Sequence, residues 1–350
     1  MGAGCFACGA TELERVDGPP APWQYVACAR CHHASLVPMP NPSELREHYN
    51  SAYMVPLDAY LGSTKRHVRT AAAAIGARAP GRMLEVGCSY GAVLAAFRAR
   101  GWEVEGIELD ARTAAWGREH FGLTVHTGDL AQVRDALHPP YDVIAMYHVI
   151  EHVPDPRPLL ADVRELLAPD GILVIRTPNV RSAIATVAQG WWEWALAPEH
   201  VHLFSPQSLT RVLADAGFRT DGWKSLRGDA TGIVTELLRT SARRTIKDDA
   251  RHPPRSDGSV PPPAPAPPRF PHVRRALNVL ATPLDTLVAW GGALGLPAGP
   301  ELVLTARRGG RAGDGPGTGR GRTPSEFDEP GCSVMHRAHV FIRIAATDSS

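Results

Sequence analysis

The sequence lacks an excess of charge of either sign. Its 37 Lys and Arg residues are balanced by 36 Asp and Glu residues, so the formal net charge is +1 at pH 7. Proteins that bind nucleic acid or an anionic membrane surface usually carry a large positive excess. We therefore expect no nucleic-acid partner, and the balance favours a small molecule as the substrate.

Long hydrophobic runs are also missing. The longest candidate, residues 277–296, is interrupted by Pro283, Asp285 and the Gly291-Gly292 pair, and it is a poor match to the roughly 20 apolar residues of a membrane span. The N-terminus has no basic segment followed by an apolar one, so no signal peptide is expected. These absences predict a cytoplasmic protein whose six cysteines are reduced or metal-bound.

Cysteine is scarce, yet four of the six cysteines form two pairs near the N-terminus. Cys5 and Cys8 form one Cys-x-x-Cys pair, and Cys28 and Cys31 form a second, with 19 residues between the two pairs. Four thiolates with this spacing suit one tetrahedral structural zinc ion. Residues 1–40 are too few to hold a hydrophobic core without such a metal. We predict a zinc-binding module, with four reduced or disulfide-bonded cysteines as the alternative.

Strand and helix patterns alternate in the middle of the chain and predict an α/β fold. Repeated units of this length argue for a parallel sheet with helices on both faces. A helical lead-in is expected over 41–80, and a last strand over 301–306 should close the sheet. The expected strands are 83–86, 103–109, 123–126, 141–147, 171–176 and 218–226, and the expected helices are 92–100, 111–121, 156–167 and 209–216.

Composition divides the chain into six parts. Proline crowds the segment 248–270, which favours an extended linker. Glycine and arginine dominate the start of the C-terminal part, which favours disorder. The predicted parts are a zinc-binding module (1–40), a helical lead-in (41–80), an α/β core (81–247), a Pro-rich linker (248–270), a helical segment with the closing strand (271–308) and a disordered tail (309–350).

A glycine-containing loop, an acidic residue and a Gly-Asp pair follow three successive strands. Gly87 and Gly91 have no Cβ, so a ligand can approach the backbone, and the next helix offers free N–H groups to a carboxylate. Glu108 lies 21 residues after Gly87, at the end of the next strand, where an acidic side chain can accept both ribose hydroxyls. Gly128 and Asp129 follow the third strand, where an adenine would lie.

This set, in this order, resembles the class I S-adenosylmethionine-dependent methyltransferases over roughly residues 60–227. The resemblance implies a Rossmann-like sheet and S-adenosylmethionine as cofactor. The loop of that family usually carries glycine where Ser89 stands. By resemblance, the cofactor-binding residues are Glu85, Gly87, Cys88, Ser89, Gly91, Glu108, Leu109, Asp129, Leu130 and Tyr147.

The segment after the fourth strand reads His148-Val149-Ile150-Glu151-His152. It resembles the loop of many small-molecule methyltransferases, and quinone-biosynthesis O-methyltransferases carry Glu-x-x-Glu-His there, thought to hold a divalent metal. His148 replaces the first Glu here, so a metal at this place remains open. The pattern also matches the H-x-x-E-H of some zinc peptidases, but Pro154 and Pro156 oppose the helix that this chemistry needs.

The stretch from Glu199 to Ser205 resembles methyltransferases that act on sugars, quinones and natural-product intermediates. Sugar C-methyltransferases place a catalytic Glu-His pair near this position and carry the same zinc knuckle. By that resemblance His200, with Glu199, is the first choice for a general base, followed by His202 and His148. The tryptophans at 191, 192 and 194 would wall an apolar pocket. The alternative is that each histidine only makes local hydrogen bonds.

The resulting prediction is methyl transfer from S-adenosylmethionine to an oxygen or carbon of a small biosynthetic intermediate. An apolar surface at 271–296 could contact a membrane surface or a lipid-linked substrate. One alternative is an α/β hydrolase, because Gly87-x-Ser89-x-Gly91 fits a nucleophile elbow that Asp170 and His200 or His202 would complete. A second alternative is a zinc-ribbon interaction protein with a non-catalytic Rossmann-like domain.

Overall fold

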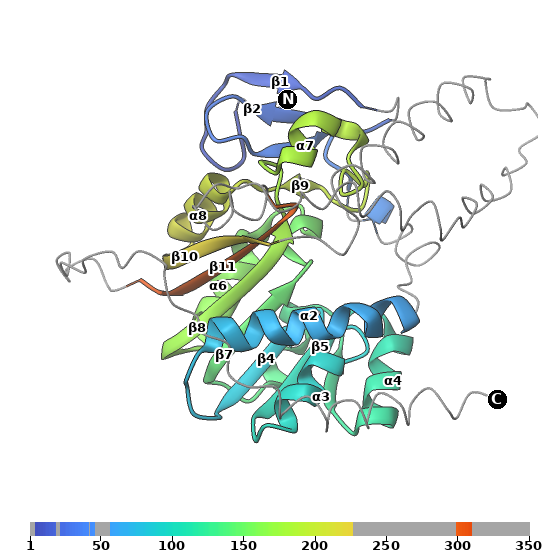
Figure 1. Cartoon of the computed structure of the whole chain (residues 1–350), viewed down its shortest axis with the longest axis vertical. Coiled ribbons are helices and arrows are strands. Elements are labelled where there is room, and N and C mark those ends of the chain that lie inside the picture. The colour runs from blue at the N-terminus through green and yellow to red at the C-terminus, as the bar shows by residue number, and fades with distance from the viewer. Residues whose placement is uncertain (1–3, 19–21, 42, 46–56, 227–298, 310–350) are drawn as a thin grey trace, which may run out of the picture.

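The computed structural model describes residues 4–18, 22–41, 43–45, 57–226 and 299–309 (Figure 1). The expectations for the Pro-rich linker, for the apolar stretch 277–296 and for the tail beyond 309 lie outside these residues. Two sheets make up the described part, and the smaller one contains the cysteine pairs.

A seven-stranded sheet in the order β10-β11-β8-β7-β4-β5-β6 forms the centre of the molecule. Its five strands from β8 to β6 run parallel, as the repeated strand–helix units predict. The strands are β4 (Arg82–Val86), β5 (Glu103–Glu108), β6 (Thr124–Thr127), β7 (Tyr141–Tyr147), β8 (Leu167–Pro178), β10 (Phe218–Leu226) and β11 (Glu301–Arg308).

Helices cover both faces of this sheet. Alternate residues of β7 point to opposite faces, so Ile144 and Met146 pack in one buried cluster and Val143 and Ala145 in the other. The first cluster includes α5 (Leu130–Val133), α6 (Pro156–Leu166) and α8 (Pro206–Asp215), and the second includes α2 (Leu57–Ile75), α3 (Ala92–Arg98) and α4 (Ala111–Phe121). This is the Rossmann-like arrangement that the sequence predicts, and α2 crosses one face of it (Figure 1).

The placement of β11 differs from the sequence prediction. We expected a parallel sheet closed by 301–306, but β11 lies between β8 and β10 and runs antiparallel to both. Leu302 and Leu304 are buried on one face and Val303 on the other, which suits an interior strand. An antiparallel strand needs no crossover helix, so the helix–strand pattern did not indicate its position.

The smaller sheet joins two distant parts of the chain. It contains β1 (Leu13–Arg15), β2 (Gln24–Cys28), β3 (Ala34–Val37) and β9 (His202–Leu203), in that order. The first three strands belong to the N-terminal module, whereas β9 follows β8 of the large sheet and the short helix α7 (Ala183–Ala188). Figure 1 shows the module above the large sheet, with α7 and β9 against it.

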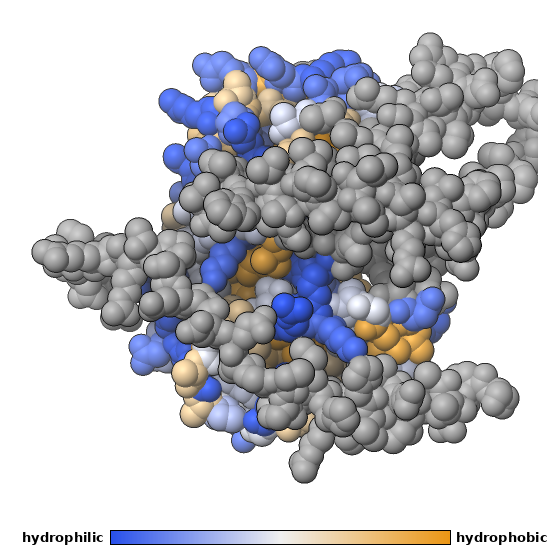
Figure 2. Space-filling model, viewed as in Figure 1, coloured by the Kyte–Doolittle hydropathy of each residue, from blue (hydrophilic) through white to orange (hydrophobic). Residues whose placement is uncertain are grey.

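Hydrophilic residues cover much of the visible described surface, with hydrophobic residues between them (Figure 2). Within the described ranges, no helix has the length and apolar character needed to span a membrane.

Candidate cofactor and acceptor site

The glycine loop, residues 87–91, connects the carboxyl end of β4 to α3. Gly87 and Gly91 have φ values of 74° and 76°, which favour glycine. A Cβ at Gly87 would lie 2.6 Å from Val149 Cγ2, and one at Gly91 would lie 2.5 Å from Leu123 Cδ1. Ser89 has a φ of 49° and so adopts the left-handed conformation that the usual glycine would adopt. The loop therefore has its tight form despite the serine.

Glu108 joins the end of β5 to the glycine loop. Its Oε2 accepts a hydrogen bond from Ser89 N at 2.7 Å, and its Oε1 accepts one from Asp110 N at 2.9 Å. Burial raises the pKa of Glu108, and these backbone donors oppose that shift. The carboxylate is half-buried, and Leu109 beside it is 68% exposed. An acidic acceptor next to an exposed apolar side chain suits a ribose and a flat base.

Two buried polar atoms without a partner lie at the carboxyl ends of neighbouring strands. Glu85 Oε2 on β4 and Tyr147 OH on β7 have no hydrogen-bond partner in the described structure. Burial, with a further contribution from Glu108, raises the pKa of Glu85 well above its usual value. Buried polar groups are nearly always hydrogen-bonded. A ligand with polar groups, such as the amino-acid part of S-adenosylmethionine, would fit this deficit.

For three of the other expected cofactor residues, the structure limits which atoms a ligand could contact. The Cys88 side chain is buried against Gly106, and that of Leu130 is buried in the core, so each can reach a ligand only through its backbone. Asp129 is exposed at the N-terminus of α5, and its carboxylate accepts a hydrogen bond from Gln132 N at 2.9 Å.

Tyr60 on α2 contacts the glycine loop, and the sequence reasoning missed it. Its hydroxyl accepts a hydrogen bond from Ala92 N at 2.9 Å and donates one to Cys88 O at 3.2 Å. The lead-in helix therefore supports the glycine loop directly. A lone aromatic residue in an Ala-rich helix was the only signal for this role.

His148, the third candidate base, lies between two buried carboxylates. Its Nδ1 is 3.1 Å from Glu151 Oε1, and its Nε2 is 3.1 Å from Glu301 Oε1. Both ring nitrogens must carry protons to donate to carboxylates, so this ring is an imidazolium. Burial lowers the pKa of His148, but the two carboxylates outweigh it and raise the pKa to about 9. The structure therefore argues against His148 as a proton acceptor.

Glu301 and Arg176 form a buried ion pair that sequence reasoning did not identify. Arg176 donates from Nε and Nη2 to the two carboxylate oxygens of Glu301, and both side chains are 0% exposed. Arg66 on α2 lies 3.5 Å from the same carboxylate. A single acidic residue at the start of an apolar strand was the available signal.

His200 and His152 face each other nearby, with ring centroids 4.6 Å apart. His200 Nδ1 is 2.7 Å from Trp194 O, and His152 Nδ1 is 3.0 Å from Glu199 O. A carbonyl can only accept, so each Nδ1 carries the proton and each Nε2 keeps its lone pair. Burial lowers the pKa of His200, which favours its neutral form. His200 Nε2 is therefore able to accept a proton.

The Glu–His–His group, formed by Glu151, His152 and His200, could alternatively hold a divalent cation. Its three ligand atoms lie within 4.8 Å of one another. Glu151 already accepts hydrogen bonds from His148 and from Thr177 Oγ1, the latter at 2.9 Å. The metal alternative for this segment would therefore use Glu151 and His152 together with His200, and not with His148, which occupies the position of the first Glu.

His202 is a different case from His200. Its Nε2 is 3.0 Å from Pro154 O, and its Nδ1 is 3.1 Å from both His33 Nε2 and Ser35 Oγ. The side chain is 0% exposed, with both nitrogens engaged. Because neither ring nitrogen is available to take a proton from the methyl acceptor, the structure does not support His202 as a base. Glu199 is half-buried, and its backbone carbonyl accepts from His152.

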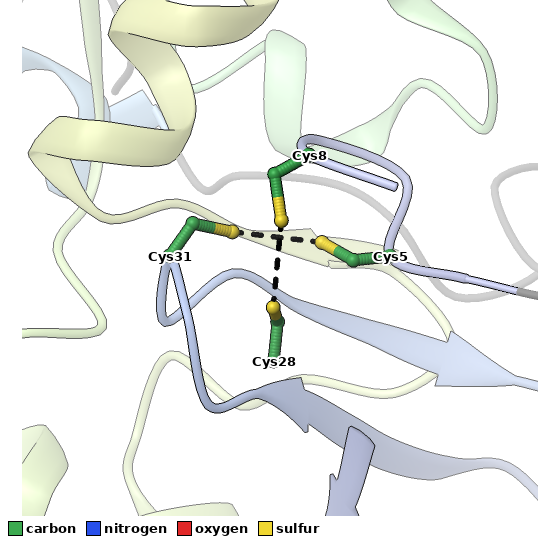
Figure 3. A group of neighbouring side chains, drawn as sticks. All are labelled: Cys5, Cys8, Cys28 and Cys31. Carbon is green, nitrogen blue, oxygen red and sulfur yellow. Dashed lines mark hydrogen bonds between the residues drawn. The ribbon is translucent and has the colours of Figure 1, made fainter. Parts of the chain in front are cut away.

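The cysteine cluster, Cys5, Cys8, Cys28 and Cys31, is compact (Figure 3). All four sulfur atoms lie within 4.8 Å of one another, with Cys5 and Cys31 3.5 Å apart and Cys8 and Cys28 3.6 Å apart. A disulfide would need about 2.05 Å. Four sulfurs about 2.3 Å from a central zinc ion would lie roughly 3.8 Å apart. The cluster therefore fits a tetrahedral ion.

The residues needed for the hydrolase alternative lie at opposite ends of the sheet. Ser89 follows the carboxyl end of β4, whereas Asp170 lies in the first half of β8, where its backbone carbonyl accepts from Arg78. β4, β7 and β8 are parallel, so these positions cannot form a triad.

Sequence comparison finds a methyltransferase domain in this chain. A family profile described as a methyltransferase domain matches residues 58–221. The ubiquinone biosynthesis O-methyltransferase of Thiobacillus denitrificans is 29% identical over an alignment of 172 residues, and the alignment covers 46% of this chain and 73% of that protein. The one from Actinobacillus pleuropneumoniae serotype 7 is 29% identical over 134 residues, 35% of this chain and 57% of that protein. The crystal structure of a SAM-dependent methyltransferase from Archaeoglobus fulgidus is 17% identical, with a TM-score of 0.44, and covers 71% of this chain and 99% of that one.

The Rossmann-like sheet and the glycine loop define a class of cofactor-binding α/β enzyme. Together with the matched domain, they identify residues 58–221 as a class I S-adenosylmethionine-dependent methyltransferase domain. The chain spans between about half and three quarters of the length of the two curated relatives described above.

Proposed function

We propose that this chain transfers a methyl group to an oxygen or carbon of a small biosynthetic intermediate, with oxygen as the first choice. The observation that carries the proposal is the link from Glu108 to Ser89 N, because it builds an acidic site at the glycine loop. Gly87–Gly91, Glu85 and Tyr147 would hold the amino-acid part of the cofactor, and Glu108, Leu109 and Asp129 would hold its nucleoside. The relatives named for ubiquinone biosynthesis favour a phenolic acceptor over a sugar.

S-adenosylmethionine, when bound, supplies an electrophilic methyl group on a sulfonium. The protein must orient the acceptor, exclude water and remove one proton from it. His200 would take that proton at Nε2, while Trp194 O keeps the other ring proton at Nδ1. Burial lowers the pKa of His200, which favours the neutral ring that can accept a proton.

The Trp194 ring would form part of the acceptor pocket. It lies parallel to His148, with ring centroids 5.0 Å apart, and parallel to His200, with centroids 5.9 Å apart. A flat aromatic acceptor suits walls of this kind, because stacked rings bury area without side-chain strain. We also propose that the cysteine cluster holds one structural zinc ion.

A substitution of His200 tests the assignment of the base. His200→Gln should lower kcat by about 10²-fold to 10⁴-fold, because general-base catalysis typically contributes that much. Release of S-adenosylhomocysteine would be measured with a panel of catechols, hydroxyquinones and nucleotide sugars. The binding of S-adenosylhomocysteine should stay unchanged, since His200 is assigned to the acceptor side.

His120→Gln is the matched control. His120 is exposed on α4, and its Nδ1 also lies near a backbone carbonyl, 3.0 Å from Trp116 O. This variant should keep full activity. Full turnover by His200→Gln, with the acceptor that the wild type prefers, would refute the assignment.

A further inference from the structure

Most of the His200 segment, residues 199–205, pairs with the N-terminal module rather than with the large sheet. β9 in this segment pairs antiparallel with β3, so that Ala34 opposes Leu203 and Ser35 opposes His202. Leu36 N also donates to Val201 O at 3.0 Å. Figure 1 shows β9 against the module. The segment that carries the candidate base therefore supplies the fourth strand of the module's own sheet.

Side chains fasten the segment to the module at both of its ends. Tyr25 on β2 donates from its hydroxyl to His200 O at 2.6 Å, and the tyrosine is buried. At the other end, Ser205 Oγ donates to Cys31 O at 2.6 Å. Cys31 belongs to the cysteine cluster, so the segment is hydrogen-bonded directly to a residue of that cluster. Tyr25 acts on the residue that carries the candidate base itself.

The buried contacts of the segment also involve the N-terminal module. Val201 and Leu203 belong to a buried cluster that contains Tyr25 and Leu36 from the module and residues of α7. No strand of the seven-stranded sheet contributes a buried residue to that cluster. β9 is two residues long, too short to keep its place without a partner. The core around Val201 and Leu203 is therefore shared by the module and α7, whereas Phe204 at the end of the segment packs in the first cluster with the large sheet.

We propose that the N-terminal module is part of the catalytic apparatus, with Tyr25 as a positioning residue that holds His200 against the acceptor. The inference rests on the proposed function of His200. Loss of the module's order should abolish methyl transfer while the glycine loop, which lies on the large sheet, still binds the cofactor. The module thereby links the metal state of the four cysteines to turnover and not to cofactor affinity.

Tyr25→Phe in the full-length, zinc-loaded protein removes only the hydroxyl that donates to His200 O. We expect kcat to fall about 10-fold to 100-fold, because small misplacements of catalytic groups have effects of this size. The KM of the acceptor should change less than kcat, and the Kd of S-adenosylhomocysteine should stay within about twofold by calorimetry. Amide hydrogen exchange in residues 199–205 should become faster.

Tyr141→Phe is the matched control, because it also removes a buried tyrosine hydroxyl, one that accepts from His138 N at 3.1 Å near the amino end of β7. It should leave kcat and exchange in 199–205 unchanged. A Tyr25→Phe enzyme with wild-type kcat and wild-type exchange in 199–205 would overturn the proposal. An equal loss of turnover in both variants would also overturn it, as it would reflect a general loss of stability.

Removal of zinc with a chelator provides a second, independent arm. We expect the metal-free chain to bind S-adenosylhomocysteine with an affinity within about threefold of the loaded protein, with fast exchange in 199–205 and no turnover. Turnover at the loaded rate without zinc would contradict the inference. If His200→Gln is fully active, the proposed base is wrong; if that variant is inactive while Tyr25→Phe and the metal-free chain are active, only the role of the module is wrong.

Discussion

Replacement of Glu301 by Gln tests the buried charge network on which the acceptor side is built. Glu301 opens β11 and accepts hydrogen bonds from Arg176 and from His148 Nε2. Glutamine keeps the volume and one acceptor oxygen but removes the negative charge. The guanidinium of Arg176, which is 0% exposed, would then lose its charge partner without access to water.

The size of the effect follows from that burial. Removal of one partner from a buried ion pair typically costs about 3–5 kcal/mol, because the remaining charge is left uncompensated. A domain is stable by only about 5–15 kcal/mol, so the loss should be large. Glu103→Gln is the control, since Glu103 pairs with Arg82 at 2.9 Å with its side chain 74% exposed, and such pairs contribute at most about 1 kcal/mol.

The network also predicts how stability depends on pH. Burial alone would raise the pKa of Glu301, but His148 and Arg176 lower it. The contribution of Glu301 to stability is therefore present above the unfolded pKa of about 4.3 and is lost as pH falls. The pKa of His148 is raised to about 9, so its contribution is complete below about 6.5 and is lost as pH rises through 9. The network should therefore stabilise most between about pH 4.5 and 6.5.

The assay is denaturation in urea at several pH values, followed by tryptophan fluorescence. We expect the free energy of unfolding of Glu301→Gln at pH 6 to be lower than that of the wild type by about 3–5 kcal/mol, and that of Glu103→Gln to be nearly unchanged. A Glu301→Gln protein within about 1 kcal/mol of the wild type would refute the reasoning, because Arg176 would then not depend on this carboxylate.

Three further changes test the rest of the site. Gly87→Ala should weaken the binding of S-adenosylhomocysteine at least about tenfold and lower the Tm, because the added Cβ would lie 2.6 Å from Val149 Cγ2 at a φ of 74°; unchanged calorimetric binding would contradict this. Tyr60→Phe removes the hydroxyl that bonds Ala92 N and Cys88 O and should weaken the same binding about fivefold, with little change in the KM of the acceptor. If the Glu–His–His group transfers a proton and holds no metal, added Mg²⁺ or Mn²⁺ should not change turnover by the zinc-loaded enzyme. A strict requirement for either ion would favour the metal alternative.

Much of the large sheet could be predicted because short stretches of sequence determine its strands and helices. The apolar strands β4 and β7 and the helices after them have the periods that burial on a sheet requires, so they were located within a few residues. The glycine loop was equally local, since Gly87 and Gly91 are needed where the backbone adopts a positive φ. The cysteine spacing placed four sulfurs that the fold then brings together.

The residues that could not be predicted are those that depend on pairings between distant segments. Glu301 meets His148 across 153 positions of sequence, and nothing near either residue indicates the other. The strand β9 pairs with β3 only because the N-terminal module lies against it, which also explains why His202 bonds His33 and is no candidate base. Local patterns identify elements, but tertiary contacts decide which polar side chains share a site.

Calorimetric titration with S-adenosylhomocysteine, on the wild type and on Glu108→Ala, tests the central claim most directly. Glu103→Ala, at the other end of the same strand, is the control. We expect saturable micromolar binding by the wild type and the control, and loss of binding in Glu108→Ala, because that carboxylate fixes Ser89 N and is the proposed acceptor for the ribose hydroxyls. No binding by well-folded, zinc-loaded wild type, or undiminished binding by Glu108→Ala, would contradict the claim that this loop and this carboxylate form the cofactor site.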